Sequence, residues 1–121
     1  MTLFDSTQLL LEAAMRGSSL RQTLLTNNLA NVNTPGYQRR DVDFHATLRA
    51  AQASDGVGGT DLSSVAFSPT VETGRVMRPD GSGVDPDQES ASLAENSLEY
   101  EALVQVANTR NAILQTAMGV R

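Results

Sequence analysis

The chain has 121 residues, no cysteine, one histidine and a formal net charge of −5 at pH 7. The lack of Cys excludes disulfide scaffolds, thiol catalysis and zinc fingers, and the acidic balance argues against a nucleic-acid surface, which needs clustered cations. No apolar run approaches the roughly twenty residues of a membrane span, and the first residues lack the pattern of a cleaved secretory signal. We therefore expect at most one domain, with no membrane span, no nucleic-acid partner, no metal and no cofactor.

The large apolar side chains gather toward the two ends of the chain, around a polar and glycine-rich middle. Leu, Ile, Val and Phe together make up about 23% of the residues, just above the level at which chains tend to stay disordered. This distribution predicts a mainly α fold, in which long N- and C-terminal helices pair as a coiled-coil-like bundle around a small irregular or β-hairpin segment. The predicted parts are residues 1–34, 35–84 and 85–121.

The N-terminal helix is predicted to begin near Asp5, which can cap it together with Gln8, while Phe4 and Leu9 can form a hydrophobic staple. Apolar residues then follow two adjoining rows with spacings of three, four and seven, which indicates a packing seam. Gly17 is the narrowest point of this seam. The residues expected to pack in it are Leu10, Leu20, Leu24 and Leu29.

A turn is predicted directly after this helix. Pro35 disfavours helical geometry at Thr34, so the helix should end near Asn33. Pro35 and Gly36 fit the two central positions of a type II turn, where the second residue has a positive φ.

The middle of the chain contains two short β-prone pieces, at residues 64–67 and 71–77, separated by turn-forming residues. We expect a small hairpin or an extended loop there. The glycine-rich stretch 52–64 is predicted to be disordered.

The C-terminal helix is predicted to begin with Asp85 as its cap and Pro86 at its first position, followed by acidic residues that favour a helix N-terminus. Its apolar stripe is wider than one partner helix requires, which is typical of a helix packed against several neighbours. Leu103, Ile113 and Leu114 are the expected packing residues.

Asp41, Asp43 and His45 are the candidates for a chemical site, because alternate residues of an extended strand share one face. Such a group could bind a metal or act as acid and base. The alternative is a solvated loop or an interface contact, since no second His or Cys completes a site. The acidic stretch 80–89 lacks the glycine and glutamate of an EF-hand loop.

Four asparagines crowd the last turns of the N-terminal helix, where Asn is a poor helix former. They can mark a fraying helix end. Alternatively, their amides hydrogen-bond to other chains and fix the register of a bundle, as a buried Asn does in coiled coils. These residues are Asn27, Asn28, Asn31 and Asn33.

Residues 28–37 read NLANVNTPGY and resemble the signature N-x-A-N-x-x-T-P-G-Y of the rod and hook family of bacterial flagellar axial proteins. The resemblance extends to both ends of the chain. It implies a structural, non-enzymatic rod subunit of the flagellar basal body that assembles helically through its terminal helices into part of the drive shaft and export channel. It also implies that turn and assembly contacts are made by Asn28, Asn31, Thr34, Pro35, Gly36 and Tyr37.

The resemblance further implies where such a subunit goes and what it meets. Its partners would be other copies of itself, other rod proteins, ring or adaptor proteins at the base of the rod, and the flagellar type III export apparatus. It would reach the periplasmic rod without a cleaved signal peptide. Phe44 and Leu48 are similar to an F-x-x-x-apolar element for recognition at the export gate, although they could equally anchor the assembled rod.

Two other functions fit parts of the sequence. A small helical adaptor or export chaperone would show the same paired amphipathic ends, but it should be stable alone or as a small closed oligomer. A hydrolase built on Asp41, Asp43 and His45 is the second alternative.

Overall fold

The computed structural model describes residues 6–54, 61–73, 79, 81 and 83–119. Two long helices dominate this part of the chain, which confirms the mainly α fold class. The elements in chain order are helix α1 (Ser6–Ala30), strand β1 (Arg40–Asp41), helix α2 (Phe44–Ser54), the 3₁₀ helix η1 (Leu62–Ser64), strand β2 (Thr70–Val71) and helix α3 (Pro86–Ala117).

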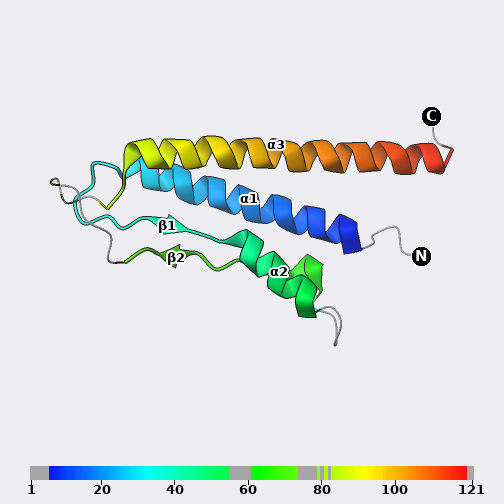
Figure 1. Cartoon of the computed structure of the whole chain (residues 1–121), viewed down its shortest axis with the longest axis horizontal. Helices are drawn as coiled ribbons and strands as arrows, with labels where there is room; N and C mark the ends of the chain where they lie inside the picture. The colour runs from blue at the N-terminus through cyan, green and yellow to red at the C-terminus, as the bar shows by residue number, and fades with distance from the viewer. Residues whose placement is uncertain (1–5, 55–60, 74–78, 80, 82, 120–121) are drawn as a thin grey trace.

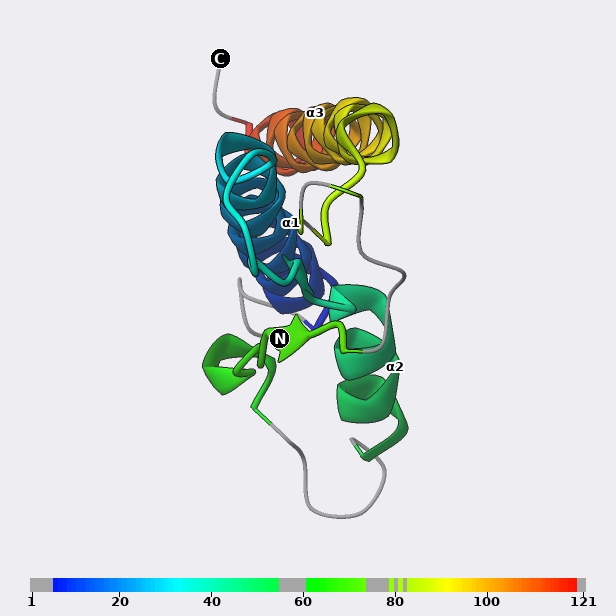
Figure 2. The same cartoon turned by 90° about the vertical axis from the view of Figure 1, so that its left-hand side faces the viewer.

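Helix α1 lies in the middle of the molecule, with α3 along one side and α2 on the other (Figures 1 and 2). The two long helices are antiparallel, so the start of α1 and the end of α3 lie at the same end. Because α3 has 32 residues and α1 has 25, α3 extends beyond the start of α1. None of the described helices is long and apolar enough to cross a membrane.

The two long helices form largely where the sequence predicts them. Asp85 caps α3 by accepting hydrogen bonds from the backbone N–H groups of Asp87 and Gln88, and Pro86 is the first helical residue. Helix α1 runs without a break through Gly17 and ends at Ala30, followed by turns. The predicted cap and staple residues at the start of α1, Phe4 and Asp5, lie outside the described residues.

The middle of the chain differs from the prediction, because helix α2 occupies a part expected to be turn, loop or strand. The Asp43 carboxylate accepts a hydrogen bond from the Ala46 N–H and so caps this helix. Phe44, Leu48 and Ala51, at helical spacing, are its buried residues. Helix α2 continues to Ser54, so the start of the stretch predicted to be disordered is helical; residues 55–60 lie outside the described part.

A small antiparallel pair of strands is present in the middle of the chain, as predicted, but its strands overlap the predicted pieces only at Val71. Strand β1 precedes α2 and pairs antiparallel with β2, placing Arg40 opposite Val71 and Asp41 opposite Thr70. Residues 65–69 are not in a strand, and residues 74–78 lie outside the description. A helix and η1 therefore separate the two paired segments, which makes this a long-range pairing that local turn signals do not reveal.

The apolar core lies mainly between α1 and α2. Ala13, Ala14, Phe44 and Leu48 form one buried cluster, and a second joins α2 to η1 and the residue that follows it. The missing side chain of Gly17 leaves the space that Phe44 occupies, because a Cβ atom at Gly17 would lie 2.6 Å from the Phe44 Cβ. The seam is narrow at Gly17, as predicted, but the residue that fills it comes from α2.

Candidate assembly site

Asn28 is the centre of the asparagine-rich segment and is completely buried. Its Nδ2 donates hydrogen bonds to the Arg40 carbonyl (2.7 Å) and to Glu89 Oε1 (2.8 Å). Its Oδ1 accepts from the Arg40 N–H (3.0 Å) and from the Tyr37 hydroxyl (3.1 Å). All four hydrogen-bonding capacities of the amide are used within one chain. Asn28 therefore joins the end of α1 to β1 and to the first turn of α3.

The turn after α1 has the predicted geometry. The Tyr37 N–H donates to the Thr34 carbonyl across it, and Gly36 has a φ of +77°. The Gly36 N–H donates to the carbonyl of Gly81, so this turn also binds the segment that leads into α3. The side chain of Asn31 bonds to the Asn27 carbonyl and accepts from the Thr34 hydroxyl. Thr34, Pro35 and Gly36 are exposed.

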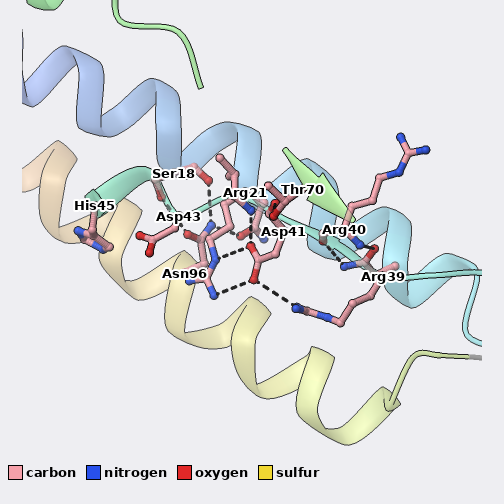
Figure 3. A network of polar contacts seen from close by, with 12 residues as sticks. Ser18, Arg21, Arg39, Arg40, Asp41, Asp43, His45, Thr70 and Asn96 are labelled. Atoms are coloured by element: carbon pink, nitrogen blue, oxygen red, sulfur yellow. Dashed lines mark hydrogen bonds and ion pairs between the residues drawn. The ribbon is translucent and has the colours of Figure 1, made fainter. Parts of the chain in front are cut away.

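Arg39 is a buried cation that contacts three carboxylates, and Figure 3 shows its contact with one of them, Asp41. Its guanidinium makes two hydrogen bonds to Glu89, at 3.0 and 2.9 Å, and contacts Glu72 at 2.6 Å and Asp41 at 3.3 Å. The Glu89 side chain has no exposed surface. Burial opposes the charge of Arg39, but the hydrogen bonds to Glu89 and the charges of all three carboxylates outweigh it and raise the pKa of Arg39.

Asp41 extends this ion cluster to α1. Its carboxylate accepts two hydrogen bonds from Arg21, at 3.0 and 3.4 Å, and one from the Val42 N–H. Burial alone would raise the pKa of Asp41, but the bonds from Arg21 and Val42, together with the charges of Arg21 and Arg39, lower it below its ordinary value. The carboxylate therefore stays ionised in the folded chain.

A second buried polar contact joins α1 and α3 about two turns away from Glu89. Asn96 Nδ2 donates to the Ser18 carbonyl at 2.9 Å and to Gln22 Oε1 at 2.8 Å. The Ser18 hydroxyl bonds to Asn96 Oδ1 at 3.3 Å, and both residues are completely buried. The Gln22 amide also donates to the Ser97 hydroxyl at 3.2 Å. The helix pair is thus joined by hydrogen bonds as well as by apolar contacts.

The predicted packing residues divide into three groups. Leu24 is buried, and Leu10 and Leu103 pack against the cluster that contains Phe44. Leu20, Leu29 and Leu114 are half-buried, whereas Ile113 is 63% exposed. The residues that remain accessible lie toward the outside of the helix pair, where a neighbouring molecule can reach them.

Phe44 and Leu48, the candidates for export recognition, are core residues of the folded chain. Phe44 is 1% exposed, and both side chains belong to the cluster with Ala13 and Ala14. A partner cannot contact Phe44 or Leu48 extensively unless α2 leaves α1.

The candidate chemical residues Asp41, Asp43 and His45 line one cavity of 380 Å³, but they do not share a strand, because the strand ends at Asp41 and α2 begins at Phe44. Asp41 belongs to the ion cluster, Asp43 caps α2, and His45 Nε2 lies 2.7 Å from Glu99 Oε1 on α3. The expectation that all three share one face of a strand is therefore wrong. Over the described ranges, no group of three His, Cys, Asp or Glu side chains could hold a metal ion.

Four residues of these polar contacts had no predicted role in packing. Glu89 stands in the first turn of α3, where the sequence suggests only a favourable helix-end charge. Ser18 occupies a seven-residue row that is otherwise apolar, and this interruption is the signal that could have identified it. The row of Asn96, in contrast, also contains Glu89 and Arg110. Arg39 carries no comparable local signal. These residues are Ser18, Arg39, Glu89 and Asn96.

Comparison with known proteins places this geometry in a family. The model of the family described as "Flagella basal body rod protein" matches residues 11–38, which span most of α1 and the turn after it. The "Flagellar basal body rod protein FlgB" of Bacillus subtilis (strain 168) is 32% identical over 125 residues, covering 98% of this chain and 97% of that protein.

Two further relatives carry the same name. The FlgB protein of Aeromonas hydrophila is 30% identical, covering 95% of this chain and 94% of its own length. The FlgB protein of Cereibacter sphaeroides is 33% identical, covering 81% of this chain and 82% of its own length.

Two long terminal helices and an asparagine-rich turn, together with these matches, define a structural subunit of the bacterial flagellar basal-body rod. The relatives are named as flagellar basal body rod proteins. The chain belongs to the FlgB family of flagellar basal body rod proteins, and its place is the flagellar basal body.

Proposed function

We propose that this chain is a proximal-rod subunit that assembles helically through α1 and α3, and that it forms part of the torque-transmitting shaft and export channel. The observation that carries the proposal is an apolar stripe on the outward face of α3. Leu98 is 68% exposed, Val106 52% and Ile113 63%. Their spacings of eight and seven residues put them on one face of the helix.

The outward stripe begins beside the face that α3 packs on α1, because Val106 and Ile113 also line a groove with residues of α1, and Leu98 lies farther round the helix. Asn96 and Leu103 point to α1 and the core, so α3 carries useful contact groups on two sides. Burying the outward side chains releases about 25 cal/mol per Å² of apolar surface, offset by the entropy of ordering the partners. A neighbouring subunit that covers this stripe supplies burial that one chain cannot supply alone.

A groove at the open end of the helix pair supports the same proposal. It has a cavity volume of 460 Å³ and is lined by residues of both terminal helices, including Leu11, Val106, Ile113 and Leu114. A neighbour seated in this groove would contact both ends of the chain at once. Contacts of this kind between different surfaces of like subunits do not close and produce a helical assembly.

The turn at the opposite end of α1 offers a second contact surface. Thr34, Pro35 and Gly36 are exposed, while Asn28 and Tyr37 hold the turn from inside. In this proposal the exposed residues meet neighbouring subunits, and Asn31 keeps the turn in shape through its bond to Thr34.

Family membership also supports the proposed partners and route. The partners are other copies of this chain, other rod proteins and the ring or adaptor proteins at the base. The subunit reaches the periplasmic rod through the flagellar type III export apparatus, without a cleaved signal peptide and without catalytic activity. Phe44 and Leu48 would be available for gate recognition before folding, and would then become core residues. Recognition at the export gate and packing in the folded subunit are therefore compatible, because recognition comes first.

The test places a charge in the exposed stripe. Ile113→Asp should leave the fold and secretion of the subunit intact but block its incorporation into basal bodies, because a neighbour would have to bury an unpaired carboxylate. The control is Gln115→Asp, two residues away at an exposed polar position. Measurements are helicity by circular dichroism, the secreted amount, the subunit content of isolated basal bodies, and swimming.

Normal incorporation of Ile113→Asp would contradict assembly through this stripe. A chain that sediments as a small closed oligomer and never enters basal bodies would instead favour the adaptor or chaperone function.

A further inference from the structure

Three buried polar residues lie in the seam between α1 and α3, namely Ser18, Glu89 and Asn96. The seam consists of one row on each helix with a spacing of seven residues, and Ser18 of one row bonds to Asn96 of the other. The row on α1 is Leu11, Ser18, Leu25 and Val32. The row on α3 is Glu89, Asn96, Leu103 and Arg110.

Rows that repeat every seven residues do not define a unique alignment by themselves. A shift of α3 along α1 by one heptad, roughly 10 Å, again brings seam positions of the two helices together. Hydrophobic burial is non-directional, so apolar contacts discriminate poorly among the register of this structure and the two shifted ones.

The polar residues remove this ambiguity. After a shift by one heptad the Asn96 amide would face Leu11 or Leu25 in place of Ser18. It would lose both side-chain partners, the Ser18 hydroxyl and Gln22 Oε1. The Glu89 carboxylate would leave Asn28 and Arg39, which supply its three hydrogen bonds. A buried amide or carboxylate without partners is strongly disfavoured.

We propose that Glu89 and Asn96 together set the register of α3 on α1, and that they contribute more to selecting this register than to overall stability. Buried Asn residues specify register in coiled coils, and buried ion pairs can often be replaced by apolar side chains without loss of stability. The register also fixes how far the outward stripe of α3 is displaced relative to α1. That consequence for assembly rests on the proposed function, whereas the register itself does not.

Pairs of introduced cysteines can report the register, since the chain has no Cys of its own. Gln22→Cys with Ser97→Cys reports the register of this structure, in which these side chains are hydrogen-bonded at 3.2 Å. Gln22→Cys removes one acceptor of Asn96 in every chain compared, so differences between chains come from the other substitutions. Gln22→Cys with Ser90→Cys or with Val104→Cys reports a shift by one heptad in either direction. A bifunctional thiol reagent with a reach well below the roughly 10 Å heptad step links only the pair that is aligned.

The test variant is Arg39→Met/Glu89→Leu/Asn96→Leu, which replaces both register residues and the cation that Glu89 neutralises. We expect the purified full-length variant to remain helical by far-UV circular dichroism. Cross-linking of one or both shifted pairs should rise about tenfold or more over the background with native residues at these positions, because the polar penalty on shifted registers is gone. With the native residues, only the pair at 22 and 97 should cross-link.

The matched control makes the same three substitutions at exposed positions, with Glu and Asn again seven residues apart. It is Arg49→Met/Glu101→Leu/Asn108→Leu, and it should cross-link only at 22 and 97. A further variant carries Asn96→Ala in place of Asn96→Leu, which removes the amide without adding volume. If the Leu variant loses helicity and the Ala variant keeps it, the loss is due to overpacking by Leu.

Four results would overturn the proposal. They are a helical test variant that still cross-links only at 22 and 97, loss of helicity with both Leu and Ala at position 96, shifted products in the control, and failure of the native pair to cross-link. The experiment uses the isolated chain, so the proposed assembly can fail without affecting it.

Discussion

The contact between Gly17 and Phe44 offers a sharp test of the packing between α1 and α2, because two effects of opposite sign meet there. Gly17→Ala removes a poor helix former from the interior of α1, which by itself would stabilise the helix by about 1 kcal/mol. The new methyl group, however, would lie 2.6 Å from the Phe44 Cβ, 2.8 Å from its Cγ and 3.1 Å from its Cδ2.

The steric effect should win. The closest atom, Cβ, is fixed to the backbone of α2, so rotating the Phe44 ring does not relieve the contact. Helix α2 has to move away, which loosens a cluster in which Phe44 is 1% exposed. Overpacking of this kind costs about 1 to 3 kcal/mol. After the gain in helix propensity is subtracted, we expect a net loss of up to about 2 kcal/mol.

The assay is thermal unfolding of the full chain, followed by circular dichroism at 222 nm. A net loss of this size corresponds to a melting temperature lower by up to about 8 °C for a chain of this length. Ser19→Ala is the control, because Ser19 is an exposed residue of the same helix and its substitution adds helix propensity without a new contact. If Gly17→Ala raises the melting temperature as Ser19→Ala does, the close approach of α2 to α1 is refuted.

Three further predictions concern the polar end of the molecule. Glu89→Leu alone should destabilise the chain by about 1 to 3 kcal/mol in urea unfolding, because buried donors of Arg39 and Asn28 lose their acceptor while Glu72 and Asp41 still pair with the Arg39 charge; Arg39→Met in the same chain should recover part of this loss. The lowered pKa of Asp41 means that its stabilising effect is complete above its ordinary pKa of 3.8 and disappears as the pH falls through the lower folded value. The stability difference between the native chain and Asp41→Asn should therefore be constant near neutral pH and shrink below about pH 4, and a difference that grows on acidification would contradict the ion cluster. Gly36→Val should cost about 1 to 2 kcal/mol through backbone strain alone, since φ is +77° and no atom lies near the added Cβ; equal stability of the two chains would show that the turn relaxes.

The sequence predicted those parts of the fold that depend on local signals. The Asp85 cap with Pro86 marked the start of α3, and Pro35 with Gly36 marked the turn after α1. Both signals act within a few residues, so they survive in any tertiary context.

Helix α2 was missed because its neighbourhood is rich in glycine and because the alternation of Asp41, Asp43 and His45 suggested a strand. The spacing of Phe44, Leu48 and Ala51 was available, but an eleven-residue helix is marginal without packing. Its stability depends on the packing of Phe44 against Gly17 of α1, and a contact between residues so far apart in sequence leaves no local signal.

The ion cluster could not be predicted for a related reason. Arg39 and Glu89 are far apart in sequence, and each has an ordinary local explanation as an exposed charge. Their pairing depends on the antiparallel arrangement of α1 and α3 and on the β1–β2 pairing that brings Glu72 to the same place. Ser18 was closer to prediction, because a polar residue within an apolar heptad row suggests a buried hydrogen bond.

The two ends of the helix pair differ in a way that fits a subunit made for assembly. At the end that holds Asn28, Arg39 and Glu89, buried polar groups bond within one chain, so this end can fold and fix the register without a neighbour. At the other end, α3 extends beyond α1 and exposes Ile113. Polar groups demand partners in a defined geometry, whereas apolar side chains accept any surface of suitable shape. A chain that pairs its buried polar groups internally has a defined monomer geometry. If it also leaves apolar side chains exposed, it has an unfilled contact surface. Ordered assembly requires both properties.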